Sequence, residues 1–314
     1  MENAEALVLR TVDFSESSLI LTLLTREFGK IEGMAKGARR TKNPFETSLD
    51  LLARIRVSFL RKKGDVLDLL TEAKLLRRFR PSPSNFAGLY AAYYWISLID
   101  ALTENGDPQP GLFDLAVATL NRFEAGTHVV RTLLRAEWFL LRQIGQQPVL
   151  DRCVACGKPV TETNIVRAKE CNQRFSFGLS DGGILCSRCR TAHRQVMSVS
   201  AGALHDLKIL IRPKRAERAL QDDRRRDEQM IGGATPRENA LHEATLREEW
   251  AETPMERSTI NEIRGWTNQY FWQILGKRPQ LQGALALIAR YDPAQDDPAQ
   301  NNPAQDDSAQ DDLE

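Results

Sequence analysis

Residues 53–62 read Ala53-Arg-Ile-Arg-Val-Ser-Phe-Leu-Arg-Lys62 and alternate between apolar and polar side chains. Ile55, Val57 and Phe59 fall on one face, and the polar residues between them fall on the other. This two-residue period is typical of a β-strand with one buried face. A Lys-Gly-Asp turn then leads into an apolar stretch at 66–73, which predicts the next strand.

Three further strands are predicted before this pair. Residues 6–14 and 19–25 are rich in β-branched and apolar side chains, and residues 31–37 begin a third such run. Five short strands within about 75 residues, with one longer connection over 38–52, are typical of a small closed barrel. We therefore expect a five-stranded OB-type β-barrel over residues 1–80.

The region after the barrel is predicted to be mostly helical. Pro81-Ser-Pro-Ser84 interrupts the chain, and Ser84 or Asn85 is a suitable N-cap for a helix that extends to about Leu102. Helical periodicity of apolar residues returns at 112–124, 129–144, 201–211 (with Ser200 as N-cap) and 258–290. The expected fold class is α+β, with a helical domain at 81–150 that continues over 196–290.

Two Cys-x-x-Cys pairs, Cys153/Cys156 and Cys186/Cys189, lie 29 residues apart in a segment without helical periodicity. Each pair brings two sulfurs together in a tight turn, and two such turns complete a tetrahedron of thiolates about 2.3 Å from zinc. We expect an inserted module at 151–195 with one structural Zn²⁺. Two disulfides or a redox Cys-x-x-Cys are the alternatives. Cys171 is expected to be a plain thiol, and His193 is a lesser alternative ligand.

Charge is unevenly distributed along the 314 residues. Net charge is only +1, but residues 292–314 carry eight acidic and no basic side chains, so residues 1–291 carry 43 basic and 34 acidic ones. The tail repeats Pro-Ala-Gln-Asp-Asp with small changes, and we expect it to be disordered. It is either a solubilising segment or a competitor of DNA for the barrel. Residues 214–257, dense in mixed charge, are expected to be a flexible or loosely helical insertion.

The barrel segment carries most of the excess positive charge. Between positions 30 and 63 it has only three acidic residues. The basic residues in this stretch are Lys30, Lys36, Arg39, Arg40, Lys42, Arg54, Arg56, Arg61, Lys62 and Lys63. Arginine and lysine suit phosphate oxygens, and Phe45 offers a possible base-stacking face. We expect DNA contacts from Lys36, Arg39, Arg40, Lys42, Arg54 and Arg56; the alternative is a solvated charged face.

Several function classes find no support in the sequence. It contains no phosphate-binding Gly-rich loop, no metal-hydrolase spacing of its four histidines and no Gly-x-Ser-x-Gly elbow, so we expect no enzyme. No apolar run approaches the roughly 18 residues of a membrane span, and the acidic N-terminus lacks a signal-peptide layout. We expect a cytoplasmic protein, in which thiols stay reduced.

Several motifs follow one another along the chain in a specific order. They are Ala6-Leu-Val-Leu-Arg10, Glu27-Phe-Gly-Lys30, Ala35-Lys-Gly-Ala-Arg-Arg40, the two cysteine pairs, Gly182-Gly-Ile-Leu-Cys186 and Leu275-Gly-Lys-Arg278. Together they resemble the RecO family of bacterial recombination mediators, and the resemblance covers roughly residues 5–212 and 258–281. The insertion and the acidic tail depart from the family pattern.

The resemblance implies a bacterial, nucleoid-associated protein of DNA repair and homologous recombination after DNA damage, in the RecF pathway. It implies binding of single- and double-stranded DNA, annealing of complementary strands, and RecA loading with RecR on strands coated by single-strand-binding protein, whose C-terminal tail is a further partner. By position, Lys36, Arg39, Arg40 and Lys42 take a DNA-contact role, and the four paired cysteines take the zinc-ligand role. Two rivals remain: a zinc-ribbon adaptor that binds protein without annealing strands, and a nuclease with a cryptic carboxylate site.

Overall fold

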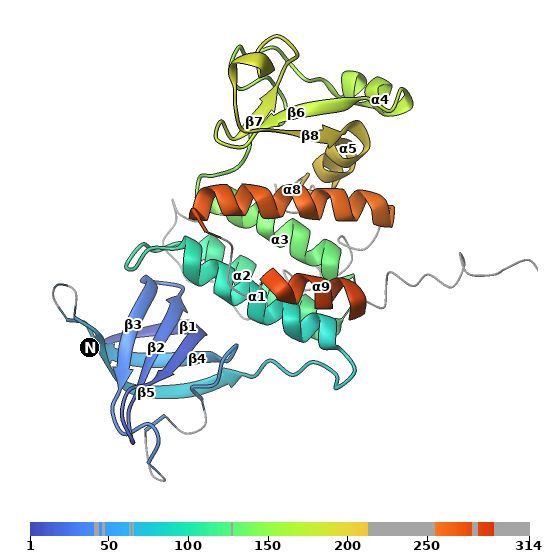
Figure 1. Cartoon of the computed structure of the whole chain (residues 1–314). Coiled ribbons are helices and arrows are strands. Elements are labelled where there is room, and N and C mark those ends of the chain that lie inside the picture. The colour runs from blue at the N-terminus through green and yellow to red at the C-terminus, as the bar shows by residue number, and fades with distance from the viewer. Residues whose placement is uncertain are drawn as a thin grey trace, which may run out of the picture.

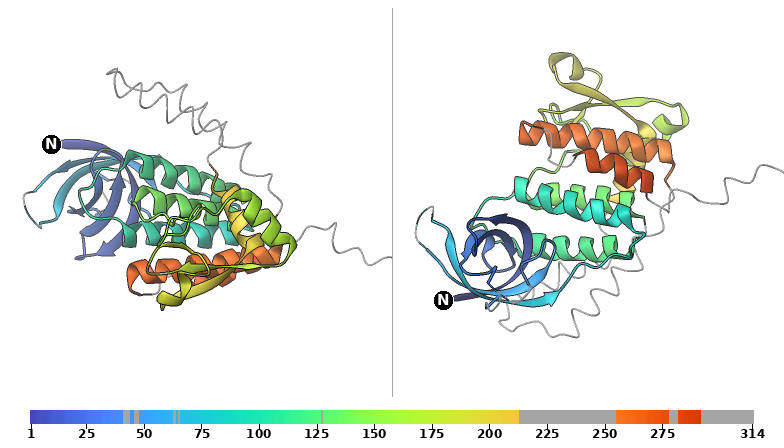
Figure 2. Two further views of the ribbon diagram at one scale, coloured as in Figure 1. Left: turned by 90° about the horizontal axis from the view of Figure 1, so that it is seen from above. Right: turned by 60° about the horizontal axis from the view of Figure 1, so that its bottom comes forward.

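The computed structural model describes residues 1–40, 44–45, 48–62, 64, 66–126, 128–212, 255–277 and 282–291. A β-barrel lies at one end, a layer of helices lies in the middle, and a small module with its own sheet lies at the other end (Figure 1). The right-hand view of Figure 2 shows the same order. Lys42, nearly all of the predicted insertion at 214–257 and the tail at 292–314 lie outside the described residues.

The five predicted strands form a closed barrel, which confirms the expected fold class. They are β1 (Glu2–Asp13), β2 (Leu19–Thr25), β3 (Gly29–Ala35), β4 (Arg54–Leu60) and β5 (Asp68–Arg77), in the order β1-β2-β3-β5-β4. Only the β3–β5 pair is parallel. Ile55, Val57 and Phe59 are fully buried in the barrel core, as their alternation predicts.

The predicted helices are also present, with bounds that differ by a few residues. They are α1 (Phe86–Leu102), α2 (Pro110–Ala125), α3 (Val129–Gln143), α5 (Ala201–Leu210), α8 (Arg257–Leu275) and α9 (Gln282–Tyr291). Asn85 caps α1 by accepting the Gly88 N–H at 2.8 Å, and Ser200 caps α5. Trp95, Trp138 and Trp266 are buried between the helices, so that segments distant in sequence share one apolar core. No helix among these residues is long and apolar enough to cross a membrane.

The cysteine-containing module is built on a three-stranded sheet. Its elements are α4 (Glu162–Glu170), β6 (Arg174–Gly178), β7 (Gly183–Leu185), the 3-10 turn η1 (Arg190–Ala192) and β8 (Val196–Ser200), with strand order β7-β6-β8. Phe177 of β6 packs edge-on against Trp266 and Tyr270 of α8, with ring centroids 5.0 and 5.6 Å apart. The module is therefore fixed to the helical layer by aromatic packing.

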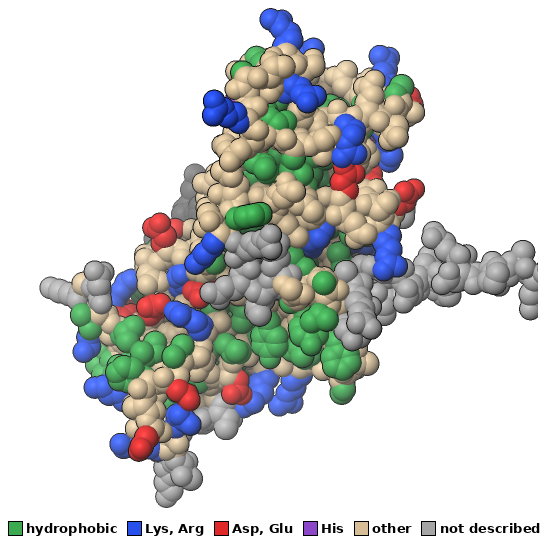
Figure 3. Space-filling model, viewed as in Figure 1, with side chains coloured by type: hydrophobic (Ala, Val, Ile, Leu, Met, Phe, Trp, Pro, Cys, Tyr) green, Lys and Arg blue, Asp and Glu red, His purple; other side chains and the backbone are tan. Residues whose placement is uncertain are grey.

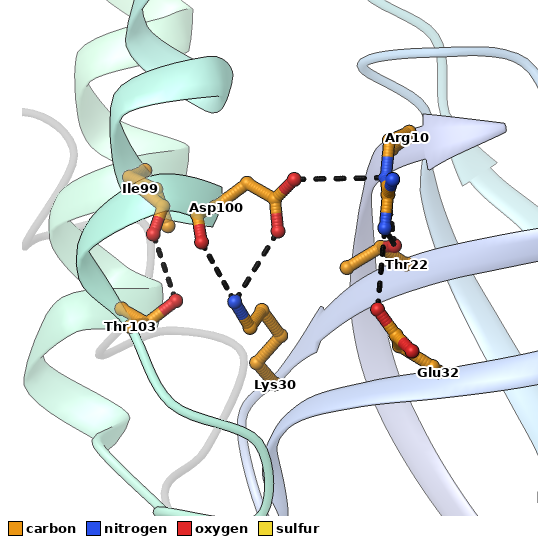
Figure 4. A network of polar contacts seen from close by, with 7 residues as sticks. All are labelled: Arg10, Thr22, Lys30, Glu32, Ile99, Asp100 and Thr103. Atoms are coloured by element: carbon orange, nitrogen blue, oxygen red, sulfur yellow. Dashed lines mark hydrogen bonds and ion pairs between the residues drawn. The ribbon is translucent and has the colours of Figure 1, made fainter. Parts of the chain in front are cut away.

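Polar contacts fix the barrel to the helices (Figure 4). The Nζ of Lys30 on β3 donates to the backbone oxygen of Asp100 on α1 at 2.7 Å and lies 3.3 Å from its Oδ1. The Nε of Arg10 on β1 lies 3.6 Å from Oδ2 of the same carboxylate, and Arg10 also pairs with Glu32 at 3.2 Å. Because Lys30 is 8% exposed and satisfied by this network, it holds the barrel in place and does not belong to a DNA-facing surface.

Candidate nucleic-acid interface and metal centre

The tip of the β1–β2 hairpin and the segment after β3 form one exposed end of the barrel. The backbone N–H of Arg39 donates to the Ser17 oxygen at 3.1 Å, and its guanidinium pairs with Asp13 at 3.0 Å. Gly37 adopts a φ of +74°, a value that glycine reaches without strain, and its oxygen accepts the Arg40 N–H at 3.0 Å. This tight turn brings exposed Lys36, Arg39 and Arg40 together, and we call these three residues the barrel basic cluster.

The ion pair between Arg39 and Asp13 leaves the Arg39 guanidinium available to a ligand. The side chains of Arg39 and Asp13 are 47% and 70% exposed, and pairs of this kind contribute little to stability in water. A ligand oxygen that replaced Asp13 at this guanidinium would disturb no buried structure.

The remaining expected DNA contacts do not share this surface. Arg56 lies in the middle of β4, opposite Lys74 of β5, and both are exposed. Arg54 is level with Leu7 and pairs with Glu5, in a groove between the barrel and α2 that Arg77 and Glu124 also line. Arg54 pairs across the sheet with Leu7, Leu7 with Leu24, and Leu24 with Lys30 of β3. Arg54 therefore lies at the height of Lys30, which is five residues, or about 17 Å along the strand, before Ala35. Lys36, Arg39 and Arg40 therefore lie together, whereas Arg54 and Arg56 stand apart from them.

Two other basic residues of this segment, Lys30 and Arg61, contact other parts of the protein. Lys30 is buried against α1, as described above. The guanidinium of Arg61 lies over the Phe28 ring, 5.3 Å from its centroid. Sequence alone does not separate these two residues from the exposed ones, because their partners come from a helix and from the β2–β3 turn.

The expectation that Phe45 offers a stacking face is wrong. Phe45 is 1% exposed and belongs to the barrel core. An exposed aromatic ring of the barrel is instead Phe14, 58% accessible, which follows Asp13 at the tip of the β1–β2 hairpin beside the barrel basic cluster. Sequence reasoning missed it by reading Phe14 as the end of a strand, although the Ser-Glu-Ser-Ser segment after it indicates a solvated turn.

The four paired cysteines meet at one point of the module. Their sulfurs lie within 4.8 Å of one another, and Cys156 Sγ is 3.7 Å from Cys186 Sγ. A tetrahedron with zinc–sulfur bonds of about 2.3 Å has edges of about 3.8 Å. The spacing of the sulfurs therefore fits a four-thiolate zinc site.

Backbone turns hold the sulfurs in this arrangement. Gly157 (φ +72°) closes the first turn by donating to the Cys153 oxygen at 2.8 Å, and Cys189 N–H donates to Cys186 oxygen at 3.1 Å in the second. The Cys186 N–H also points at Cys153 Sγ, at 3.3 Å. Such N–H donors stabilise thiolates, the form of cysteine that binds metal.

The pKa values of Cys153 and Cys189 also favour a bound cation. Burial raises the pKa of Cys153, but the backbone N–H groups of Cys186 and Cys156 outweigh it and lower that pKa to about 6. Hydrogen bonding with Cys186 and Cys156 raises the pKa of Cys189 to about 12. Four adjacent thiols cannot all ionise side by side unless a positive ion offsets their repulsion.

Cys171 and His193 lie outside this cluster. Cys171 is an exposed thiol at the C-terminal end of α4. His193 Nδ1 lies 2.9 Å from an Asp181 carboxylate oxygen, which gives the ring a partner of its own. Four cysteine ligands leave no open coordination position for water, so a metal held here is structural.

Comparisons with known proteins agree along most of the chain. Residues 1–79 match the family described as recombination protein O N terminal, and residues 83–232 match recombination protein O C terminal. A DNA repair protein RecO of Rhodopirellula baltica is 37% identical over 278 residues, which span 88% of this chain and 96% of that protein. Proteins of the same name from Symbiobacterium thermophilum and Myxococcus xanthus are 31% and 32% identical, over 67% and 66% of this chain and 79% and 80% of their own.

Proposed function

This chain belongs to the RecO family of DNA repair and recombination proteins, and from that premise we propose that it is a recombination mediator without catalytic activity. It binds single- and double-stranded DNA, anneals complementary strands and, with RecR, helps to load RecA on strands coated by single-strand-binding protein. RecR and the C-terminal tail of single-strand-binding protein are direct partners, and RecA is an indirect one. A zinc-ribbon adaptor that binds protein without annealing strands is the second candidate.

The observation that carries the proposal is the exposed barrel end. Lys36, Arg39 and Arg40 present three cations on one tight turn, with the exposed Phe14 ring on the neighbouring hairpin. Cations bind the phosphates of a single strand while an aromatic ring stacks on its bases, which is how OB barrels hold single strands. Arg54, Arg56 and Lys42 are further proposed contacts, of which Arg54 and Arg56 lie away from the barrel basic cluster.

Annealing follows from charge without covalent chemistry. Two strands repel each other through their phosphates, and a basic surface that replaces their counterions lowers that repulsion. No reacting group is needed for this step, so the protein works by binding and positioning alone. Zn²⁺ held by Cys153, Cys156, Cys186 and Cys189 would order the module and take no part in the step.

A double substitution, Arg39→Ala with Arg40→Ala, tests the DNA-contact surface. We expect weaker binding to a labelled single strand and a log–log salt dependence shallower by about 1.4, since each single-strand phosphate contact contributes about 0.7. Arg142→Ala with Arg257→Ala, which removes two exposed arginines from helices, is the matched control. An affinity and salt dependence equal to those of the control variant would mean that DNA does not bind at this end of the barrel.

A further inference from the structure

A second group of basic side chains lies on the cysteine-containing module, at the opposite end of the molecule from the barrel. Arg188 stands between Cys186 and Cys189, Arg190 opens the turn η1 and Arg194 follows it, and all three are exposed. Lys158, exposed on the first cysteine turn, adds a fourth positive charge. Lysine and arginine side chains gather over this end of the molecule (Figure 3). We call these four residues the module basic cluster.

The described ion pairs of the module include none of the four residues of the module basic cluster. Three acids of the module are engaged elsewhere, in the pairs Arg152–Asp151, Arg212–Glu162 and His193–Asp181, and Lys169 pairs with Asp206 of α5. Arg174 likewise pairs with Glu262 of α8. Apart from the net charge of −2 that Zn²⁺ with four thiolates would carry, no described ion pair offsets the charge of the module basic cluster, and the cluster is exposed.

The cysteine turns hold these cations in a fixed arrangement. The N–H groups of Cys189 and Arg190 both donate to the Cys186 oxygen, at 3.1 and 3.0 Å, and Thr191 Oγ1 donates to the Arg188 oxygen at 3.2 Å. Arginines on a rigid turn lose less entropy on binding than arginines on a free loop. Their forked donors match the oxygens of phosphate groups.

We propose that the module basic cluster is a second binding surface for the phosphate backbone of single-stranded DNA. This inference rests on the proposed annealing function, which requires two strands to be brought together. The barrel basic cluster and the module basic cluster lie at opposite ends of one chain, with the helical layer between them (Figures 1 and 2). One molecule therefore holds two strands at once, or spans one long strand at two points.

The triple substitution Arg188→Gln, Arg190→Gln and Arg194→Gln tests the proposal in the full-length, zinc-loaded protein. For a long single strand, we expect a salt dependence of affinity shallower by about 2, because three contacts of about 0.7 each are lost. For a strand of about ten nucleotides, which one barrel accommodates, we expect an unchanged affinity. Annealing of long complementary strands should slow several-fold. Zinc content and thermal unfolding, measured in parallel, show whether the module stays folded.

The matched control removes three positive charges from α4 of the module and from the adjacent helix α5: Arg167→Gln and Lys169→Gln on α4 with Lys208→Gln on α5. An equal change in both triple variants reduces the effect to net charge and overturns the proposal. So does an unchanged salt dependence in the arginine variant, and in that case DNA binding at the barrel still stands. If the wild-type protein neither binds nor anneals strands, the proposed function fails together with this inference.

Discussion

Lys30 and Lys36 are chemically identical side chains six residues apart, and their surroundings give them opposite roles. Lys30 points into the joint with α1, where the Asp100 carboxylate and backbone oxygen satisfy it. Lys36 follows the end of β3 and is exposed. The alternation of a strand predicts neither role, because the deciding partner of Lys30 lies 70 residues away on a helix.

Lys30→Gln and Lys36→Gln are predicted to have opposite effects. Lys30→Gln should lower the free energy of unfolding by about 1.5–3 kcal/mol, because Asp100 loses a charged hydrogen-bond partner at the joint, and should leave DNA affinity unchanged. Lys36→Gln should weaken DNA binding and leave the unfolding curve unchanged. Chemical denaturation and a fluorescence anisotropy titration on both variants check this. A Lys30→Gln variant with weaker DNA binding and unchanged stability, or a Lys36→Gln variant with lower stability and unchanged DNA binding, would contradict the positions described for the two residues.

Phe14→Ala is predicted to weaken single-strand binding by about 1–3 kcal/mol, the usual contribution of one stacked base. Phe14→Trp should retain the affinity because it keeps an aromatic face at the same position. Duplex affinity should change less, since paired bases are not free to stack on the ring. Equal losses for single and double strands would show that Phe14 does not stack on bases. Phe45, which is buried, has no corresponding role.

Glu262 links the helical layer to the module and gives a pH-dependent prediction. Partial burial raises its pKa, but hydrogen bonds from Ser200 at 2.5 and 2.8 Å and from Arg174 at 2.6 Å outweigh this and lower the pKa below its ordinary value. A carboxyl with a lowered folded-state pKa stabilises the fold above its unfolded value of about 4.3. That contribution is lost as the pH falls through the folded value.

Glu262→Gln should therefore destabilise the protein at neutral pH, and the difference from wild type should shrink as the medium is acidified below about pH 4. Denaturation curves of both proteins at several pH values, with equal zinc added, measure this difference. A difference that stays constant across this range would show that the Glu262 charge does not stabilise the fold.

At the scale of elements, the periodic spacing of apolar residues in the sequence predicted the strands and helices that bury one face. The alternation in β4 and the capping residues Asn85 and Ser200 placed their elements within a few residues. The helix α4 was not predicted, because only Ile165 and Ala168 are buried in its nine residues. Its start is visible in the Thr161–Asn164 capping box, which uses asparagine in place of the more usual Glu or Gln.

The cysteine turns give a prediction at the same scale. Cys186→Ser should remove zinc from the protein and lower its thermal unfolding midpoint, because β7 and the second cysteine turn lose the ion that joins them to the first turn. Cys171→Ser is the matched control, since Cys171 is exposed and outside the cluster, and should retain about one zinc per chain. Metal analysis with differential scanning calorimetry measures both effects. Equal zinc content in the two variants would contradict the assignment of the ligands.

At the scale of the whole molecule, sequence predicts the parts and the structure shows how they are joined. Arg264 of α8 pairs with Glu137 of α3 at 2.5 Å across 127 residues, and Tyr94 of α1 donates to the same carboxylate at 2.9 Å. No local pattern indicates such contacts. Together with the Lys30–Asp100 contact and the packing of Phe177 on Trp266, they hold the barrel and the module on the helical layer, with the two basic clusters at opposite ends as the two-strand account requires.

Annealing of two complementary labelled strands, bare and coated with single-strand-binding protein, tests the central claim most directly. The account predicts that the zinc-loaded protein accelerates annealing in both cases, and that Lys36→Gln with Arg39→Gln and Arg40→Gln returns the rate most of the way to the spontaneous one. The acceleration should decline steeply with added salt, because it depends on displaced counterions. A folded, zinc-loaded wild-type protein that leaves the annealing rate unchanged would contradict the account and favour the adaptor function.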